Sequence, residues 1–271
     1  MKDFTTVLDM RLEFQREILS QLREIYDGYF KKRWGTKKTF EWQGKMGFLA
    51  GVTDVIYRRH KVISQMGERW VYYRIENDSP LERAKQAFRM AGKEDAIRAE
   101  IKMGFHDFLT SLPRHNRPLE DESKLEETFA ALATLVTVAR TPVQRDGVNK
   151  IILNKPSPEG PFRFVKQMLK IARALCRVHQ TEVMTDAVYK VIIKTSVDSI
   201  PTMRWKVLEW LWANKDTVDF SIVDIERSTR TPRITLTYYL DELVILELVD
   251  RAGHRFSLSP LAREIFEGSG M

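Results

Sequence analysis

Apolar residues recur at steps of three and four through most of the chain, which predicts a mainly helical protein. The first of these stretches is 11–26, and the Asp27-Gly28 pair after it is a helix stop. Two helices are predicted within 81–112, separated near Gly92. The helices predicted further along the chain cover residues 126–139, 164–178, 187–197, 204–212, 221–227 and 233–246.

Two short apolar runs, 46–52 and 70–75, lack this helical spacing. Neither run alternates polar with apolar residues, so both are predicted to be buried strands covered on both faces, as in a parallel α/β sheet. The first run ends at Thr53-Asp54. Polar side chains at the carboxyl end of such a strand lie where α/β proteins bind ligands. The predicted fold class is therefore mainly α with a small α/β core.

Residues 29–44 mix aromatic rings with basic side chains. Rings interleaved with cations suit stacking on bases while phosphates are neutralised. One interpretation is therefore a loop that contacts nucleic acid. The other is a hairpin whose aromatic residues pack on the core and whose lysines are solvated. The contact residues that the first interpretation predicts are Lys31, Lys32, Trp34, Lys37 and Lys38.

The segment 204–258 predicts a helix, a short helix, a turn, a third helix and a two-stranded hairpin. This order resembles a winged helix, and the run LDELVILELVDR at 240–251, followed by FSLS, carries the resemblance. The resemblance implies that the third helix offers side chains to the major groove of DNA, with the hairpin as the wing. The residues concerned are Arg233, Thr237 and Tyr238 on the helix, Arg255 on the wing, and Arg230 in the turn.

The net charge of +7 is unevenly distributed along the chain. Residues 31–61 hold nine basic and two acidic residues, so this window alone is +7. Residues 201–271 hold nine basic and eleven acidic residues, a net charge of −2. DNA-binding modules are usually basic on one face, so the charge of the last segment argues against taking DNA binding for granted. Winged helices also serve as protein-docking modules, and both alternatives stay open.

The composition limits the class of protein further. An apolar fraction of 43% with 30% charged residues is typical of a soluble globular chain. A single cysteine, Cys176, rules out an internal disulfide framework and fits the reducing cytoplasm. No segment is apolar enough to span a membrane. The sequence contains no constellation of nucleophile, paired carboxylates or metal ligands, so neither a catalytic residue nor a metal site is predicted.

The stretch 44–75 resembles the sensor-1 strand, the arginine-finger region and the last core strand of AAA+ ATPases. The residues that carry the resemblance are Thr53, the Glu68-Arg69 pair, the apolar run after it, and the Ser-Pro-Leu-Glu-Arg sequence at 79–83. Residues 163–197 resemble the end of the AAA+ helical lid, with Arg163 at the sensor-2 position. The resemblance implies that Thr53 senses the γ-phosphate of ATP, that Arg69 acts in trans, and that Arg163 couples the lid to nucleotide.

The whole pattern predicts the C-terminal portion of a nucleic-acid-acting AAA+ ATPase. The predicted units are a core remnant at 1–77, a helical lid at 78–198 and a winged helix at 199–271. No G-x-x-x-x-G-K-S/T sequence occurs, so the chain is not expected to bind a cofactor or hydrolyse ATP alone. A complete relative would use ATP and Mg²⁺, and the predicted partners are nucleic acid and either further copies of the chain or the missing ATPase half. The alternative is a non-enzymatic winged-helix DNA-binding regulator with an N-terminal helical domain for oligomerisation or partner binding.

Overall fold

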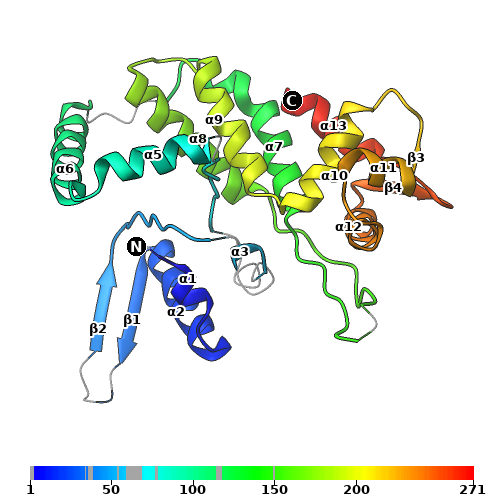
Figure 1. Ribbon diagram of the computed structural model, residues 1–271, viewed down its shortest axis with the longest axis horizontal. Helices are drawn as coiled ribbons and strands as arrows, with labels where there is room; N and C mark the ends of the chain where they lie inside the picture. Colours follow the sequence, from blue (N-terminus) through cyan, green and yellow to red (C-terminus); the bar gives the residue numbers. More distant parts are fainter. Residues whose placement is uncertain are drawn as a thin grey trace.

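The computed structural model describes residues 3–33, 35, 39–53, 55–58, 69–76, 79–113, 118–148 and 150–271. These residues form a mainly helical protein with two small antiparallel sheets, which confirms the predominance of helix (Figure 1). No helix within these ranges is long and apolar enough to cross a membrane.

The centre of the molecule is a helical body. Its elements are α7 (Glu126–Ala139), α8 (Phe162–His179), α9 (Asp186–Asp198), α13 (Pro260–Ser269) and the short 3₁₀ helix η1 (Glu122–Leu125). Phe129, Met168 and Ile192 are fully buried among them. The sequence prediction missed α13, which begins after Ser259, whose side chain accepts a hydrogen bond from the backbone N–H of Ala262.

The last unit packs against this body around the same continuous core (Figure 1). Its elements are α10 (Thr202–Ala213), β3 (Phe220–Ser221), α11 (Ile222–Thr229), α12 (Arg233–Ile245), β4 (Val249–Ala252) and β5 (Arg255–Leu258). The sheet is antiparallel in the order β3-β5-β4, and Val249 lies opposite Leu258. The three predicted helices and the predicted hairpin of this unit are confirmed.

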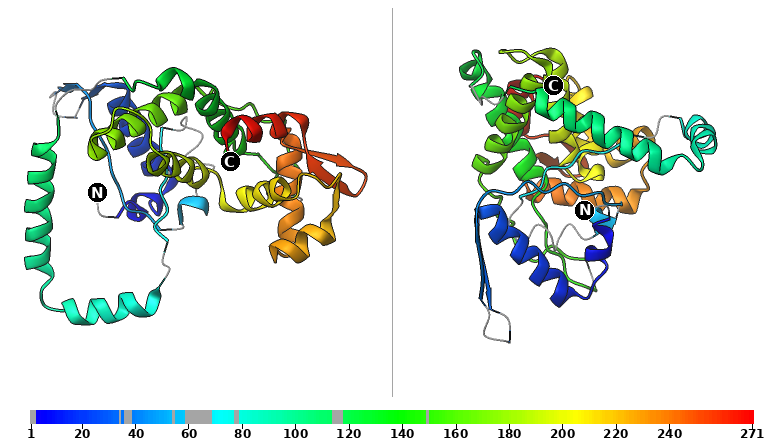
Figure 2. Two further views of the ribbon diagram at one scale, coloured as in Figure 1. Left: turned by 90° about the horizontal axis from the view of Figure 1, so that it is seen from above. Right: turned by 90° about the vertical axis from the view of Figure 1, so that its left-hand side faces the viewer.

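The N-terminal unit has a small hydrophobic cluster of its own around Phe4, Leu8 and Leu19. Its elements are α1 (Thr5–Leu8), α2 (Leu12–Asp27), β1 (Tyr29–Arg33), β2 (Thr39–Gln43) and α3 (Val55–Arg58). Helix α2 ends at Gly28, whose φ of 98° is in the left-handed region that glycine adopts without strain. Strands β1 and β2 pair as an antiparallel hairpin that projects from the unit (Figures 1 and 2).

The prediction of two strands covered on both faces is wrong for 46–52 and 70–75, because neither segment is a strand in the structure. Leu49 is 89% exposed and Ile75 is 81% exposed. The backbone N–H of Arg74 donates to the Asp198 carboxylate at 2.7 Å, so a side chain satisfies a donor that a neighbouring strand would otherwise take.

The second of these segments is instead an extended connection between the two hydrophobic clusters. Val71 packs against the core of the body, whereas Trp70 and Tyr72 pack against the N-terminal cluster. This alternation follows from extended backbone, in which successive side chains point to opposite sides. The apolar residues Trp70, Val71 and Tyr72 are therefore partly buried on two sides, by two different clusters.

Helices α5 (Pro80–Met90) and α6 (Glu94–Ser111) stand away from the helical body (Figures 1 and 2). They meet at Gly92, where φ is 80°, which confirms the predicted break between two helices. Neither helix has a buried residue.

Candidate nucleic-acid interface

Helix α12 has one buried face and one exposed face. Leu236, Leu240 and Leu243 are fully buried on the side that faces the core. The exposed residues Arg233, Ile234, Thr237 and Tyr238 follow each other at steps that place them on the opposite side. Ile234, at the centre of this exposed α12 face, is 75% exposed.

The turn that leads into α12 adds a further cation. Arg230 is exposed and has a φ of 50°, the left-handed conformation that ends α11. Its guanidinium makes no ion pair with any residue that the structure describes. An unpaired exposed cation can neutralise a phosphate without first breaking a contact within the protein.

The other two predicted arginines are paired with carboxylates. Arg233 donates from Nε and Nη2 to Glu226 Oε2 at 3.0 and 2.9 Å, and its backbone N–H donates to Oε1 at 3.2 Å. Arg255 on β5 donates to Asp219 Oδ1 at 2.9 Å. These pairs are exposed, so each stabilises the fold by no more than about 1 kcal/mol and can open toward another anion.

Tyr238 and Thr237 are occupied by contacts within the chain. The Thr237 hydroxyl donates to the Arg233 carbonyl oxygen at 2.9 Å. The guanidinium of Arg145 lies 5.1 Å from the centre of the Tyr238 ring, and its Nη2 donates to the Tyr238 carbonyl oxygen at 2.9 Å. One face of the Tyr238 ring is therefore covered by the segment that carries Arg145.

That segment, residues 141–148 and 150–160, forms an arm beside α12 (Figure 1). Its two sides are joined by a bridge between Arg145 and Ile152 and by a hydrogen bond from the Leu153 N–H to the Gln144 carbonyl oxygen at 2.9 Å. Lys155 pairs with Glu247 just beyond α12. The arm has no repeating apolar pattern, so the sequence alone does not predict its position, which depends on its tertiary contacts.

A buried ion pair fixes α12 to the rest of the molecule. The Arg204 guanidinium donates to Glu242 Oε2 from Nη2 at 2.9 Å and from Nε at 3.0 Å, and to the carbonyl oxygens of Ala139 and Thr141 at 2.7 Å each. Burial lowers the pKa of Arg204, against the opposing effect of the Glu242 carboxylate. Arg145 Nε lies 3.4 Å from the other Glu242 oxygen, so one carboxylate holds α10, α12 and the arm together.

The β1–β2 hairpin is the second predicted contact region. Lys32 Nζ pairs with Glu17 on α2 at 2.8 Å, and Lys31 Nζ pairs with Glu41 on the opposite strand at 3.4 Å. Phe30 and Phe40 contact each other across the strands, with ring centres 6.2 Å apart, and Phe40 is exposed. The aromatic pair thus packs within the hairpin rather than on the core. Trp34, Lys37 and Lys38 lie outside the described residues.

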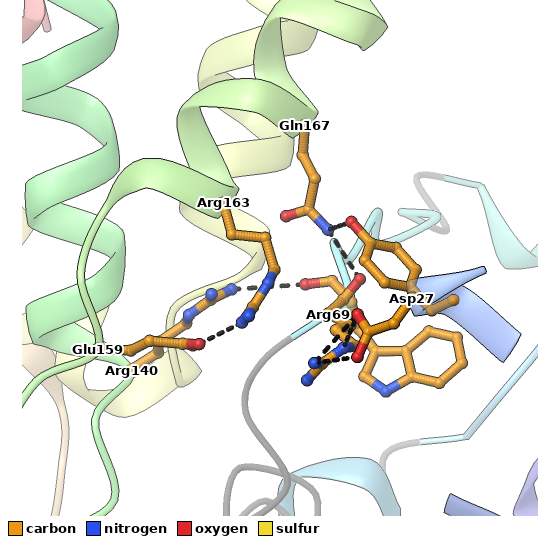
Figure 3. A network of polar contacts seen from close by, with 8 residues as sticks. Asp27, Arg69, Arg140, Glu159, Arg163 and Gln167 are labelled. Atoms are coloured by element: carbon orange, nitrogen blue, oxygen red, sulfur yellow. Dashed lines mark hydrogen bonds and ion pairs between the residues drawn. The ribbon is translucent and has the colours of Figure 1, made fainter. Parts of the chain in front are cut away.

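The predicted nucleotide-sensing residue Arg69 lies at the junction of the N-terminal unit and the helical body (Figure 3). Its Nη2 donates to Asp27 Oδ2 at 2.8 Å, and its Nε donates to Oδ1 at 3.2 Å. The Arg69 carbonyl oxygen accepts a hydrogen bond from Gln167 on α8 at 2.7 Å. The Arg69 side chain is 8% exposed, so a role in trans would require it to leave Asp27.

Arg163 lies one turn before Gln167 on α8, on the same side of the junction (Figure 3). It pairs with Glu159, four residues earlier. Arg140 also reaches this junction from the end of α7, where its Nη1 donates to the Trp70 carbonyl oxygen at 3.4 Å and its guanidinium lies 5.1 Å from the centre of the Phe164 ring. The structure therefore brings Arg69 and Arg163 to one junction, together with a third arginine that the sequence analysis did not single out.

Thr53 is not part of this junction. Its hydroxyl lies 3.2 Å from the Thr5 hydroxyl, and its backbone N–H donates to the same oxygen at 3.2 Å. Thr53 lines a groove of about 740 Å³ between residues 49–53 with Ile56 on one side and residues 71–76 on the other. Glu68, predicted beside the arginine finger, lies outside the described residues.

The candidate residues thus fall into three groups: the exposed α12 face with Arg230 and Arg255, the β1–β2 hairpin, and the arginine junction. No protein-family model, curated protein or solved structure matches the chain.

Proposed function

We propose that the chain binds nucleic acid through the exposed α12 face, the turn before it and the β4–β5 wing. The observation that carries this proposal is the arrangement of the last unit: helix, strand, helix, helix and hairpin, with strand order β3-β5-β4. This is the order of a winged helix, in which the third helix enters the major groove. In this chain that helix is α12, and its outer face is the exposed one.

The three arginines near α12 differ in how readily each can contact a phosphate group. Arg230 is the first candidate for a phosphate contact because no ion pair competes for it among the described residues. Arg233 and Arg255 must first leave their carboxylate partners before they can pair with a phosphate. The loss of these ion pairs offsets part of the binding free energy that the phosphate contact provides. Ile234, which follows Arg233 on the exposed α12 face, supplies apolar surface of the kind that contacts a thymine methyl group.

The negative net charge of the last segment does not exclude this role. Four of its acidic residues, Asp219, Glu226, Asp241 and Glu242, pair with four arginines, so each pair is locally neutral while the net charge of the segment stays −2. The arm beside α12, residues 141–160, adds three basic and two acidic residues, a net charge of +1. Local charge, rather than the sum over residues 201–271, decides whether phosphate can approach α12.

The proposal extends to the AAA+ resemblance. We infer that the chain corresponds to the C-terminal part of a nucleic-acid-acting AAA+-like ATPase in which Arg69 and Arg163 respond to nucleotide held elsewhere. The meeting of these two arginines at one junction supports this inference, since they are 94 positions apart in the sequence. ATP binding by this chain alone is expected to be weak, because no phosphate-cradling loop is present in its sequence. Submicromolar ATP affinity by calorimetry would contradict that expectation.

A second candidate function is a non-enzymatic winged-helix regulator whose front part binds a partner. The exposed apolar surface of α5 and α6 favours it. The two candidates share nucleic-acid binding by α12 and differ in whether nucleotide supplied by an ATPase partner changes that binding.

The test of the shared claim is the salt dependence of duplex binding, measured by fluorescence anisotropy with a labelled oligonucleotide. Arg230→Gln with Arg233→Gln is expected to reduce the slope of log affinity against log salt by about 2, one unit for each lost phosphate contact. Lys166→Gln with Lys170→Gln removes the same charge from exposed positions on α8 and is the matched control. Equal slopes for the two double variants would refute the α12 interface.

A further inference from the structure

Helices α5 and α6 expose an unusually large apolar surface. Phe88 is 85% exposed on α5, and Phe105 is 60% exposed on α6. The other large apolar residues exposed on these helices are Leu81, Met90, Ile101, Met103, Phe108 and Leu109. Most of the stability of a helix in a protein comes from the packing of its apolar face, and neither α5 nor α6 buries a residue. A partner must therefore cover them for the apolar residues to stabilise the fold.

The apolar residues form stripes. On α5, Leu81 and Phe88 are seven positions apart, which places them on one face. On α6, Ile101, Phe105 and Phe108 follow at steps of four and three, again on one face. Because α5 and α6 are set at an angle about Gly92, the two stripes do not cover each other (Figure 2).

The two helices carry opposite net charges. Helix α5 has three basic residues and one acidic residue, a net charge of +2, whereas α6 has two basic and four acidic residues, a net charge of −2. Arg89, Glu100 and Asp107 make no ion pair with any described residue. Glu100 and Asp107 are seven positions apart and each precedes a residue of the apolar α6 stripe. Each helix therefore presents an apolar stripe beside charges that complement the other helix.

We propose that α5 of one copy of this chain packs on α6 of a second copy, and the reverse, in a two-fold symmetric dimer. In a two-fold symmetric dimer each copy uses the same surface, so both α5–α6 contacts form at once. The assembly then stops at two copies and does not grow into a filament. The six side chains on the two stripe faces, Leu81, Phe88, Ile101, Phe105, Phe108 and Leu109, offer roughly 100 Å² each, or about 600 Å² per copy, the lower end of the area that a specific interface needs. This inference does not depend on the nucleic-acid interface.

Charge exchange between the two helices tests the proposal most sharply. In one variant, Lys85→Glu and Arg89→Glu make α5 acidic; in the other, Glu100→Lys and Asp107→Lys make α6 basic. Each variant alone is expected to be a monomer, since its α5 and α6 then repel each other across the interface. An equimolar mixture is expected to form a heterodimer, because both of its contacts join opposite charges.

The measurement is the mass of the full chain by sedimentation velocity over a concentration series. Wild type is expected to reach twice 31.7 kDa, and Phe88→Asp with Phe105→Asp is expected to raise the dimer dissociation constant at least about tenfold. Lys166→Glu with Lys170→Glu is the charge-matched control and is expected to dimerise normally. A wild-type monomer at every concentration overturns the proposal, as does a mixture of charge variants that stays monomeric while each variant keeps wild-type helicity.

Discussion

The buried pair of Arg204 and Glu242 gives the most quantitative prediction, because the two side chains join α10, α12 and the arm. Replacing Arg204 by Met removes two contacts to Glu242, at 2.9 and 3.0 Å, and two hydrogen bonds to carbonyl oxygens at 2.7 Å. Breaking one partner of a buried pair costs about 3–5 kcal/mol. Arg145 still lies 3.4 Å from Glu242, so the lower end of that range, about 3 kcal/mol, is expected for Arg204→Met.

The double variant separates the ion pair from the carbonyl contacts. Arg204→Met with Glu242→Leu removes both charges of this pair, and its main remaining loss is the unsatisfied carbonyl oxygens, about 2 kcal/mol. Arg145 loses its carboxylate partner in this variant but keeps its hydrogen bonds to the carbonyl oxygens of Lys150 and Tyr238. The double variant is therefore expected to be at least about 2 kcal/mol more stable than the sum of the two single effects predicts.

The assay is urea unfolding followed by circular dichroism, with the free energy of unfolding compared across the four proteins. Lys206→Met, also on α10, is the control, and its effect is expected to stay within about 0.5 kcal/mol. Additive single effects, or a loss below about 1 kcal/mol for Arg204→Met, would refute the account of how α12 is fixed.

Three further predictions concern the interface, the pH response and the junction. Glu226→Gln removes the carboxylate that competes for Arg233 and is expected to strengthen duplex binding about twofold to fivefold, by anisotropy at fixed salt; unchanged affinity would mean that this pair is not at the interface. The hydrogen bond from Arg173 holds the pKa of Glu122 below its ordinary value, so its stabilisation is present above about pH 4.3 and is lost as pH falls through the lowered pKa. Arg173→Met is expected to flatten the acid side of a stability profile from melting curves, and an unchanged profile would contradict this. Arg69→Met removes a nearly buried guanidinium and is expected to lower the free energy of unfolding by about 2 kcal/mol, measured in urea; no loss would show that the junction does not depend on this side chain.

Local patterns predicted the helices well. The stretch 126–139 was predicted to be a helix and is α7, because its apolar residues follow helical spacing over almost four turns. Helix α13 was missed although Ser259 before Pro260 is a helix-start signal that the sequence contains.

The failures come from contacts between distant residues. Residues 70–75 have strand composition, but Asp198 and Ser199 satisfy backbone donors of this segment and no strand forms there. The sequence predicted the candidate arginines and aromatic residues from their residue types. It did not predict which residues of the chain they contact. Glu226 pairs with Arg233 from seven positions away, and the arm that covers Tyr238 lies 93 positions earlier, so no local pattern reports either contact.

The central claim is that nucleic acid contacts the exposed α12 face, and site-specific photocrosslinking tests it most directly. A benzophenone amino acid is placed at Ile234, in the middle of this face, or at Phe88, which is similarly exposed on α5. Irradiation with labelled duplex DNA is expected to give a covalent adduct from position 234 and none from position 88. An adduct from position 88 without one from position 234 would contradict the claim.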